Sequence, residues 1–143
     1  MLELITRCYE RFRLITYRGL FSLLRERDSS LSAAEAFAVD VIYLLEEPTI
    51  KEFADCLGIS QPNATYRVNH LIQKGYVQKI PSLEDRRETH LQVTDRYLQY
   101  AERGSRSLVQ AMDVLQSRFS AEEMDVFSRV IRALSDEIDG QKL

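Results

Sequence analysis

The stretch from Thr49 to Thr94 limits the possible folds of this chain more than any other part of the sequence. It contains two short segments with helical periodicity on either side of Gly58, followed by two strand-like segments. Glycine readily adopts the left-handed conformation that ends a helix, and Pro62 suits a first helical turn, where no amide donor is needed. The pattern predicts a helix, a turn, a second helix and then a β-hairpin.

Capping boxes define where three of the expected helices begin. Each consists of a hydroxyl residue and a glutamate three positions later, whose side chains satisfy each other's free backbone amides. The pairs are Ser32 with Glu35, Thr49 with Glu52, and Ser120 with Glu123. We also expect Ser60 and Thr94 to cap the helices that follow them.

Hydrophobic periodicity and these caps predict six helices and two strands. The expected helices span residues 2–26, 32–45, 49–57, 60–74, 94–119 and 120–138, and the expected strands span residues 76–80 and 88–93. The expected fold class is mainly α with a small β-hairpin wing, in the order α-α-α-α-β-β-α-α. It amounts to a winged helix-turn-helix head flanked by long helices.

The first and last helices carry apolar stripes, which we expect to be buried because their members recur at helical spacing. On the first helix they are Leu4, Ile5, Cys8, Phe12, Ile15, Leu20, Leu23 and Leu24. On the last helix they are Met124, Phe127, Val130, Ile131, Leu134 and Ile138.

Composition excludes several classes of protein. With 45% hydrophobic and 29% charged residues, the 143-residue chain is ordinary for a folded domain. It lacks the apolar core of a signal peptide and any run near the roughly 18 apolar residues of a membrane span, so we expect a cytoplasmic protein without membrane contact. The two cysteines and two histidines form no metal-binding spacing, and no phosphate loop or nucleophile motif is present. We therefore expect no metal, no cofactor and no enzyme.

Net charge is not the feature that indicates nucleic acid. The chain carries −3, whereas duplex DNA selects for positive surfaces. Between Thr49 and Thr94, six basic and five acidic side chains leave only +1. Any contact with nucleic acid would therefore depend on where individual side chains lie.

The second helix of the pair, residues 60–74, has one apolar face and one hydrogen-bonding face. Ala64, Val68 and Leu71 recur on one side, and the segment contains no carboxylate. Asn and Gln can pair with adenine in the major groove, and hydroxyls can hold phosphates, although an ordinary solvated helix face would look similar. The candidate DNA contacts on this helix are Ser60, Gln61, Asn63, Thr65, Tyr66, Arg67, Asn69 and His70.

The expected hairpin tip, residues 81–88, supplies a second contact through Arg86 and Arg87. An exposed guanidinium can enter a narrow minor groove. Alone, two arginines would be an ordinary charged turn. Directly after a helix-turn-helix, they favour a DNA-binding wing.

These segments resemble the MarR family of bacterial winged-helix transcriptional regulators. The resemblance rests on LGISQPNATYRVNHLIQKGYV, the turn and recognition helix, and on EDRRETHLQVT, the wing. The matching positions are Leu71, Lys74, Gly75, Tyr76, Val77, Asp85, Arg87, Val93 and Thr94. The chain departs from the family pattern at Tyr97, which replaces a glycine, and at Tyr66 and Asn69, so base preference does not transfer.

The resemblance implies a homodimeric repressor that reads a palindromic operator in double-stranded DNA. Within one MarR-type domain, 1–143, residues 32–94 would form the DNA-binding lobe, and residues 1–31 and 95–143 the dimerisation lobe. Arg87 would lie in the minor groove, and Asp85 would order the wing by pairing with an arginine.

The signal to which such a regulator responds stays open. Relatives bind small aromatic effectors between the lobes, and a similar cleft could be lined by Tyr9, Phe12, Tyr17, Phe37 and Tyr43, although aromatics at helical spacing are usually core. The ligand-binding residues are unknown. Redox sensing through Cys8 is an alternative that its place on the apolar stripe disfavours. A winged helix that binds only proteins is another.

Overall fold

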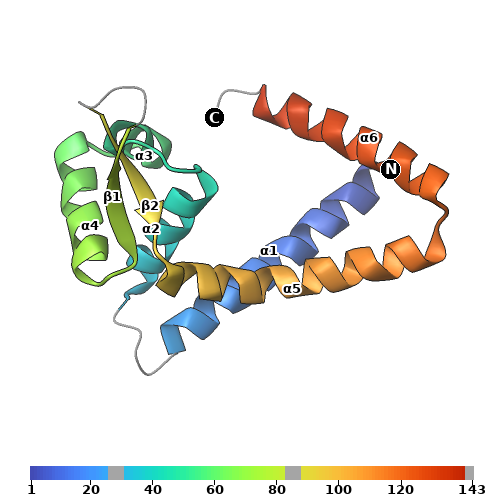
Figure 1. Cartoon of the computed structure of the whole chain (residues 1–143), viewed down its shortest axis with the longest axis horizontal. Coiled ribbons are helices and arrows are strands. Elements are labelled where there is room, and N and C mark those ends of the chain that lie inside the picture. The colour runs from blue at the N-terminus through green and yellow to red at the C-terminus, as the bar shows by residue number, and fades with distance from the viewer. Residues whose placement is uncertain (26–30, 83–87, 141–143) are drawn as a thin grey trace. The chain divides into compact units, whose positions relative to one another are not determined.

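The computed structural model describes residues 1–25, 31–82 and 88–140, and the chain divides into two compact units, Met1–Gly104 and Ser105–Leu143. Four helices come first: α1 (Leu2–Arg25), α2 (Ala33–Leu44), α3 (Ile50–Leu57) and α4 (Gln61–Gln73). Strands β1 (Val77–Pro81) and β2 (Thr89–Val93) follow, and then helices α5 (Asp95–Arg118) and α6 (Ala121–Asp139) (Figure 1). The predicted fold class and element order are confirmed.

The predicted capping boxes start α2, α3 and α6. In each box the hydroxyl oxygen accepts from the glutamate's backbone amide, and the glutamate carboxylate accepts from the amide of the cap residue. The second of these bonds measures 2.7 Å at Ser32, 2.7 Å at Thr49 and 2.8 Å at Ser120. Gly58 ends α3 with a φ of 62°, in the left-handed region expected of it.

Ser60 and Thr94 occupy the cap positions predicted for them, directly before α4 and α5. Ser60 has the extended backbone of a cap residue, but its side chain makes no capping hydrogen bond to α4. The Thr94 hydroxyl donates to the Gly75 carbonyl oxygen at 2.7 Å. The Thr94 carbonyl oxygen accepts the amides of Tyr97 and Leu98 at the start of α5. The Thr94 hydroxyl therefore joins the turn after α4 to the start of α5.

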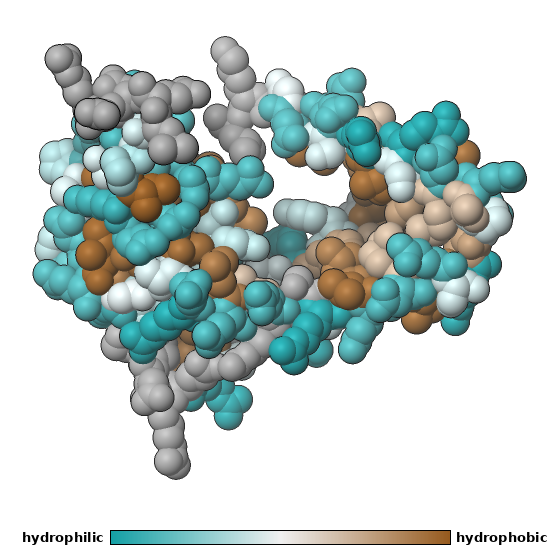
Figure 2. Space-filling model, in the orientation of Figure 1, coloured by the Kyte–Doolittle hydropathy of each residue, from teal (hydrophilic) through white to brown (hydrophobic). Residues whose placement is uncertain are grey.

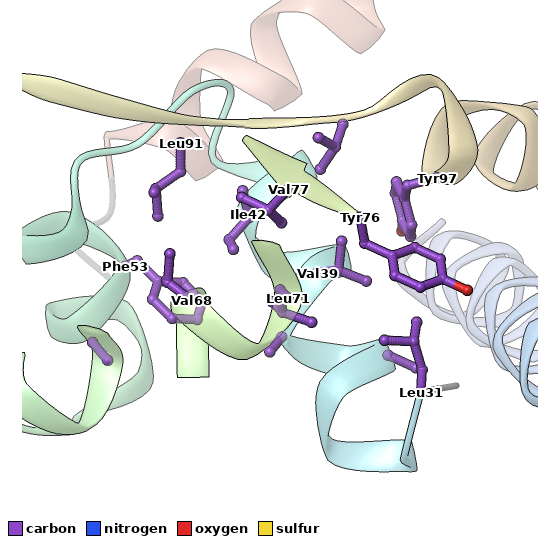
Figure 3. Close-up of a cluster of buried hydrophobic side chains, with 14 of the residues drawn as sticks. Leu31, Val39, Ile42, Phe53, Val68, Leu71, Tyr76, Val77, Leu91 and Tyr97 are labelled. Atoms are coloured by element: carbon purple, nitrogen blue, oxygen red, sulfur yellow. The ribbon is translucent and has the colours of Figure 1, made fainter. Parts of the chain in front are cut away.

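A single core holds the first unit together. Its fully buried members come from α1, α2, α3, α4, the turn before β1, the hairpin and the first turn of α5 (Figure 3). The largest are Tyr76, Tyr97, Phe53, Leu23, Ile42, Leu71, Leu91, Val39, Val68 and Val77. Strand β1 packs against α4, and β2 packs against α2 and α3. The shared core therefore holds the described part of the hairpin and α4 in fixed positions relative to each other.

The hairpin is antiparallel, with Val77 opposite Val93 and Lys79 opposite Leu91. In β2, Leu91 and Val93 are buried and Gln92 between them is half-buried, which fits the alternation predicted there. The 83–87 part of the predicted tip lies outside the described residues.

The apolar stripes of α1 and α6 are not buried as predicted. On α1 only Leu20 and Leu23 are buried, whereas the other side chains of the stripe, Leu24 and Ile15 excepted, are exposed. Helix α6 has no buried residue, and Ile131 is 46% exposed. The prediction of burial was wrong for the single chain because helical periodicity identifies an apolar face without showing what covers it. Figure 2 shows the resulting apolar surface in brown.

Despite this exposed apolar surface, no helix within the described ranges combines the length and apolarity needed to cross a membrane.

Candidate nucleic-acid interface

Helix α4 is held by its apolar face. Ala64, Val68 and Leu71 are fully buried, and the helix packs against α2, α3 and β1. This confirms the predicted division of the helix into two faces. Because the buried side chains fix the rotation of α4, its opposite face must point away from the core.

The outward face of α4 is rich in hydrogen-bonding groups. Asn63, Asn69 and Gln73 are exposed, and Tyr66 is 63% exposed. The Tyr66 ring packs on the His70 ring, with 4.4 Å between centroids and 52° between planes. From Ser60 to Lys74 the sequence has no carboxylate that would repel a phosphate. Such a face can donate to base edges and to backbone oxygens.

Three of the side chains predicted to contact DNA already form hydrogen bonds within the helix. Arg67 Nε donates to Asn63 Oδ1 at 3.2 Å, one turn away. The Thr65 hydroxyl donates to the Gln61 carbonyl oxygen at 2.9 Å, and the side chain is half-buried. Thr65 is therefore the least suited of the predicted residues to donate to DNA, while Asn63 and Arg67 would act as a pair.

All the predicted residues of α4 and its cap lie in the described part of the chain. Of these, Ser60, Gln61, Asn63, Tyr66 and Asn69 are exposed, and Thr65, Arg67 and His70 are half-buried. The predicted wing residues Asp85, Arg86 and Arg87 lie outside the described residues.

An ion pair anchors the C-terminal end of α4. Lys74 Nζ donates to both carboxylate oxygens of Glu35, at 2.7 and 2.8 Å, with side chains 27% and 19% exposed. Burial alone would raise the pKa of Glu35, but the hydrogen bonds from Lys74 and Ser32 outweigh it and hold that pKa below the ordinary value of 4.5. Glu35 thus joins the start of α2 to the end of α4. The sequence indicated Glu35 only as part of the capping box of α2 and gave no sign of its ion pair with Lys74.

A set of contacts holds β2 to the loop between α2 and α3. His90 Nδ1 lies 2.6 Å from the Glu47 carbonyl oxygen, and Gln92 Nε2 donates to Glu47 Oε1 at 2.6 Å. Leu91 N donates to the Pro48 carbonyl oxygen at 2.8 Å. Glu46 and Glu47 have φ values of 53° and 66°, unusual for residues with a Cβ. Sequence reasoning gave His90 no role, because its partner is 43 residues away.

Tyr97, where the family pattern has a glycine, is completely buried. Its hydroxyl donates to Asp40 on α2. Burial raises the pKa of Asp40, and the hydrogen bond from Tyr97 offsets part of that rise. The side chain therefore fills the junction between α2 and α5 that a glycine would leave open.

The predicted signal-sensing residues are not core residues of the single chain. Cys8 is exposed, contrary to the burial expected of it. Every aromatic side chain proposed for the effector cleft is exposed as well, from 37% at Tyr17 to 59% at Tyr9. Among the described residues, no group of three metal-binding side chains gathers in one place.

Comparison with known proteins agrees with this fold. Residues 29–88 match the model of the MarR family. No curated protein sequence matches the chain.

Solved structures resemble the chain over nearly its whole length. FabT from Streptococcus pneumoniae, crystallised in complex with DNA, is 22% identical over 98% of this chain and 96% of that chain, with a TM-score of 0.57. The transcriptional regulator Tm0710 from Thermotoga maritima is 19% identical over 100% of both chains, with a TM-score of 0.58. A MepR mutant from a multidrug-resistant S. aureus clinical isolate is 13% identical over 95% of both chains, with a TM-score of 0.62. At these identities the likeness is one of fold.

Proposed function

We propose that the protein is a transcriptional regulator of the MarR family of winged-helix regulators and that it binds double-stranded DNA as a homodimer. The match of residues 29–88 to the model of that family supports the proposal. Helix α4, within the recognition segment 60–74, enters the major groove, and the wing, residues 81–88, contacts the adjacent minor groove. The proposal includes a palindromic operator, repression of transcription and release by a small ligand.

The outward face of α4 is the observation that carries this proposal. The buried face of the helix is locked into the core, so Asn63, Tyr66 and Asn69 are presented together on a rigid element. A recognition helix needs such a face, because base edges are read by side chains that project from one side of a helix in the groove. The same fold occurs in FabT, whose structure was determined in complex with DNA.

The exposed apolar stripes support a homodimer. In the single chain, Phe12 on α1 is 46% exposed, and Phe127 and Val130 on α6 are 42% and 60% exposed. Long helices with continuous apolar faces rarely remain in water without a partner. A second copy of this chain supplies matching faces, because a two-fold interface is self-complementary.

Dimerisation would also compensate for the weak positive charge of the DNA-binding head. With +1 between Thr49 and Thr94, a single head attracts duplex DNA only modestly. Two heads held at a fixed spacing bind two half-sites at once, and the second binding event becomes intramolecular.

A salt titration of DNA binding tests the proposal. We expect the full chain to bind a random-sequence 30-base-pair duplex, measured by fluorescence anisotropy. The logarithm of the association constant should fall linearly with the logarithm of KCl concentration, with a slope of about −4 or steeper, because several phosphates are neutralised.

A winged helix that binds only proteins would behave differently in the same titration. It would show no duplex affinity even at about 50 mM salt, where phosphate contacts are strongest. That result would overturn the DNA-binding proposal.

A further inference from the structure

An aromatic side chain, that of Tyr66, lies at the centre of the outward face of α4. At 100° per residue, the buried Ala64, Val68 and Leu71 lie about 140° to 160° around the helix from it. Tyr66 is 63% exposed, so its ring projects away from the core. A side chain in this position projects toward the base pairs when a helix lies in the major groove.

Tyr66 is separate from the apolar surface that is proposed for dimerisation. Among the described residues between 45 and 98, it is the one large hydrophobic side chain that is exposed. Its neighbours on the face of α4 are the exposed amides of Asn63 and Asn69, whereas the exposed apolar residues of α1 and α6 form stripes. A lone ring is too small a patch for a protein interface, so it suits a small apolar group within a polar partner.

The ring of Tyr66 is held in place by His70, one helical turn further along α4. The two ring centroids are 4.4 Å apart, and the ring planes are inclined by 52°. Helical side chains lean toward the N-terminus of their helix, so the half-buried His70 packs against the C-terminal side of Tyr66. This contact restricts the ring before any partner binds, which reduces the entropy that binding costs.

The major groove of double-stranded DNA offers one apolar group to such a ring, the 5-methyl group of thymine. The other features of the base edges are hydrogen-bond donors and acceptors, which arginine, asparagine and glutamine can bind with two hydrogen bonds at once. Tyrosine has a single hydroxyl and cannot pair with a base in that way. Its ring, by contrast, can pack on the methyl group and exclude water from it.

We propose that Tyr66, supported by His70, selects thymine in the operator by packing its ring on the 5-methyl group in the major groove. The inference deepens the proposed function, because it names a base preference and the residue that determines it. It rests on the proposed binding of DNA by α4, and the experiment below separates a failure of that binding from a failure of the methyl contact.

Replacing thymine by deoxyuridine tests the contact, because deoxyuridine pairs with adenine in the same way and lacks only the methyl group. The probe is a duplex selected with the parent protein from a random pool, measured by fluorescence anisotropy with and without replacement of every thymine. We expect the replacement to weaken binding by the parent about fourfold or more, the loss typical of one buried methyl group. Equal affinity for the two duplexes would overturn this inference alone. No binding to either duplex, even at about 50 mM salt, would overturn both the inference and the proposed binding of DNA.

Variants assign the methyl contact to the ring of Tyr66. Tyr66→Phe keeps the ring and should still distinguish the two duplexes, whereas Tyr66→Ala should bind them equally. His70→Ala should distinguish them less than the parent does, because the ring loses its support. Gln99→Ala, an exposed amide on α5, is the control and should distinguish them as the parent does.

Two results with these variants would overturn the assignment. If Tyr66→Ala still distinguishes the duplexes as strongly as the parent, another side chain contacts the methyl group. If Tyr66→Phe no longer distinguishes them, the hydroxyl and not the ring of Tyr66 is responsible for the preference.

Discussion

At the scale of single residues, the outward face of α4 separates into groups that can read bases and groups that position the protein. Asn63 carries an amide suited to adenine, but its oxygen already accepts from Arg67 Nε. This hydrogen bond holds both side chains in one geometry in the free protein, which would reduce the entropy lost on the proposed binding to DNA. Arg87, by contrast, is expected to contribute charge in the minor groove.

Substituting these two residues should therefore produce different losses. Asn63→Ala should cost about 1–3 kcal/mol on a duplex selected from a random pool, with little change on random duplex, because a base contact is lost. Arg87→Ala should weaken binding to both, and most on sites flanked by A·T pairs. Anisotropy titrations at one salt concentration measure both effects.

Gln99→Ala, an exposed amide on α5, is the control for this comparison. Unchanged binding by Arg87→Ala would show that the wing assignment is wrong. An equal loss on both duplexes for Asn63→Ala would show that this residue reads no base.

At the scale of elements, the proposed DNA-binding head is held together by contacts between segments distant in sequence. Lys74 at the end of α4 reaches Glu35 at the start of α2, and β2 is fastened to the preceding loop through His90 and Gln92. These contacts set the angle between α4 and the hairpin. Helix α4 and the described part of the hairpin are thus fixed relative to each other.

Glu35→Gln isolates the ion pair, because glutamine can still complete the capping box. We expect the free energy of unfolding at pH 7 to fall by about 1–2 kcal/mol, since a charge-assisted hydrogen bond is lost. Urea denaturation followed by circular dichroism measures the loss. Lys74→Met should show a similar loss with the cap untouched.

The same loss should depend on pH in a defined direction. The pKa of Glu35 is lower in the folded protein than its ordinary value of 4.5, so the folded state gains stability from the ionised carboxylate. That gain is complete above about pH 4.5 and disappears as the pH falls through the lowered pKa. Glu123→Gln makes the same change in a capping box whose glutamate has no lysine partner among the described residues, so it should lower the free energy of unfolding by less. An equal loss for both variants would contradict the role of the ion pair.

At the scale of the whole molecule, the main feature is apolar surface that one chain leaves uncovered. It lies along α1, on the later part of α5 and on α6. On α6 the stripe includes Phe127, Ile131 and Leu134, whereas the exposed Arg129 lies on the opposite side of the helix at 100° per residue. This difference within one helix provides a matched test of the homodimer.

Sedimentation equilibrium should find the parent protein dimeric at micromolar concentration. Ile131→Glu should shift it to monomer, because a charge is placed inside the proposed interface. Arg129→Glu introduces the same side chain on the far face and should leave the dimer intact. A monomeric parent, or equal dissociation of both variants, would contradict the homodimer.

Much of the architecture was predictable because its signals are local. Capping boxes, Gly58 and the periodicity of apolar residues act within a turn or two of helix, so the element order follows from them. The same periodicity identified the buried and outward faces of α4. The prediction of burial along α1 and α6 was wrong for one chain, because periodicity reveals an apolar face without showing what covers it.

The sequence by itself therefore determined which segments are helix and strand, and which side chains α4 presents. Only the tertiary structure decided which distant residues meet: Glu35 with Lys74, Glu47 with His90, and Asp40 with Tyr97. The physical reason is that these partners are brought together by packing of the shared core, for which no spacing in the sequence is diagnostic.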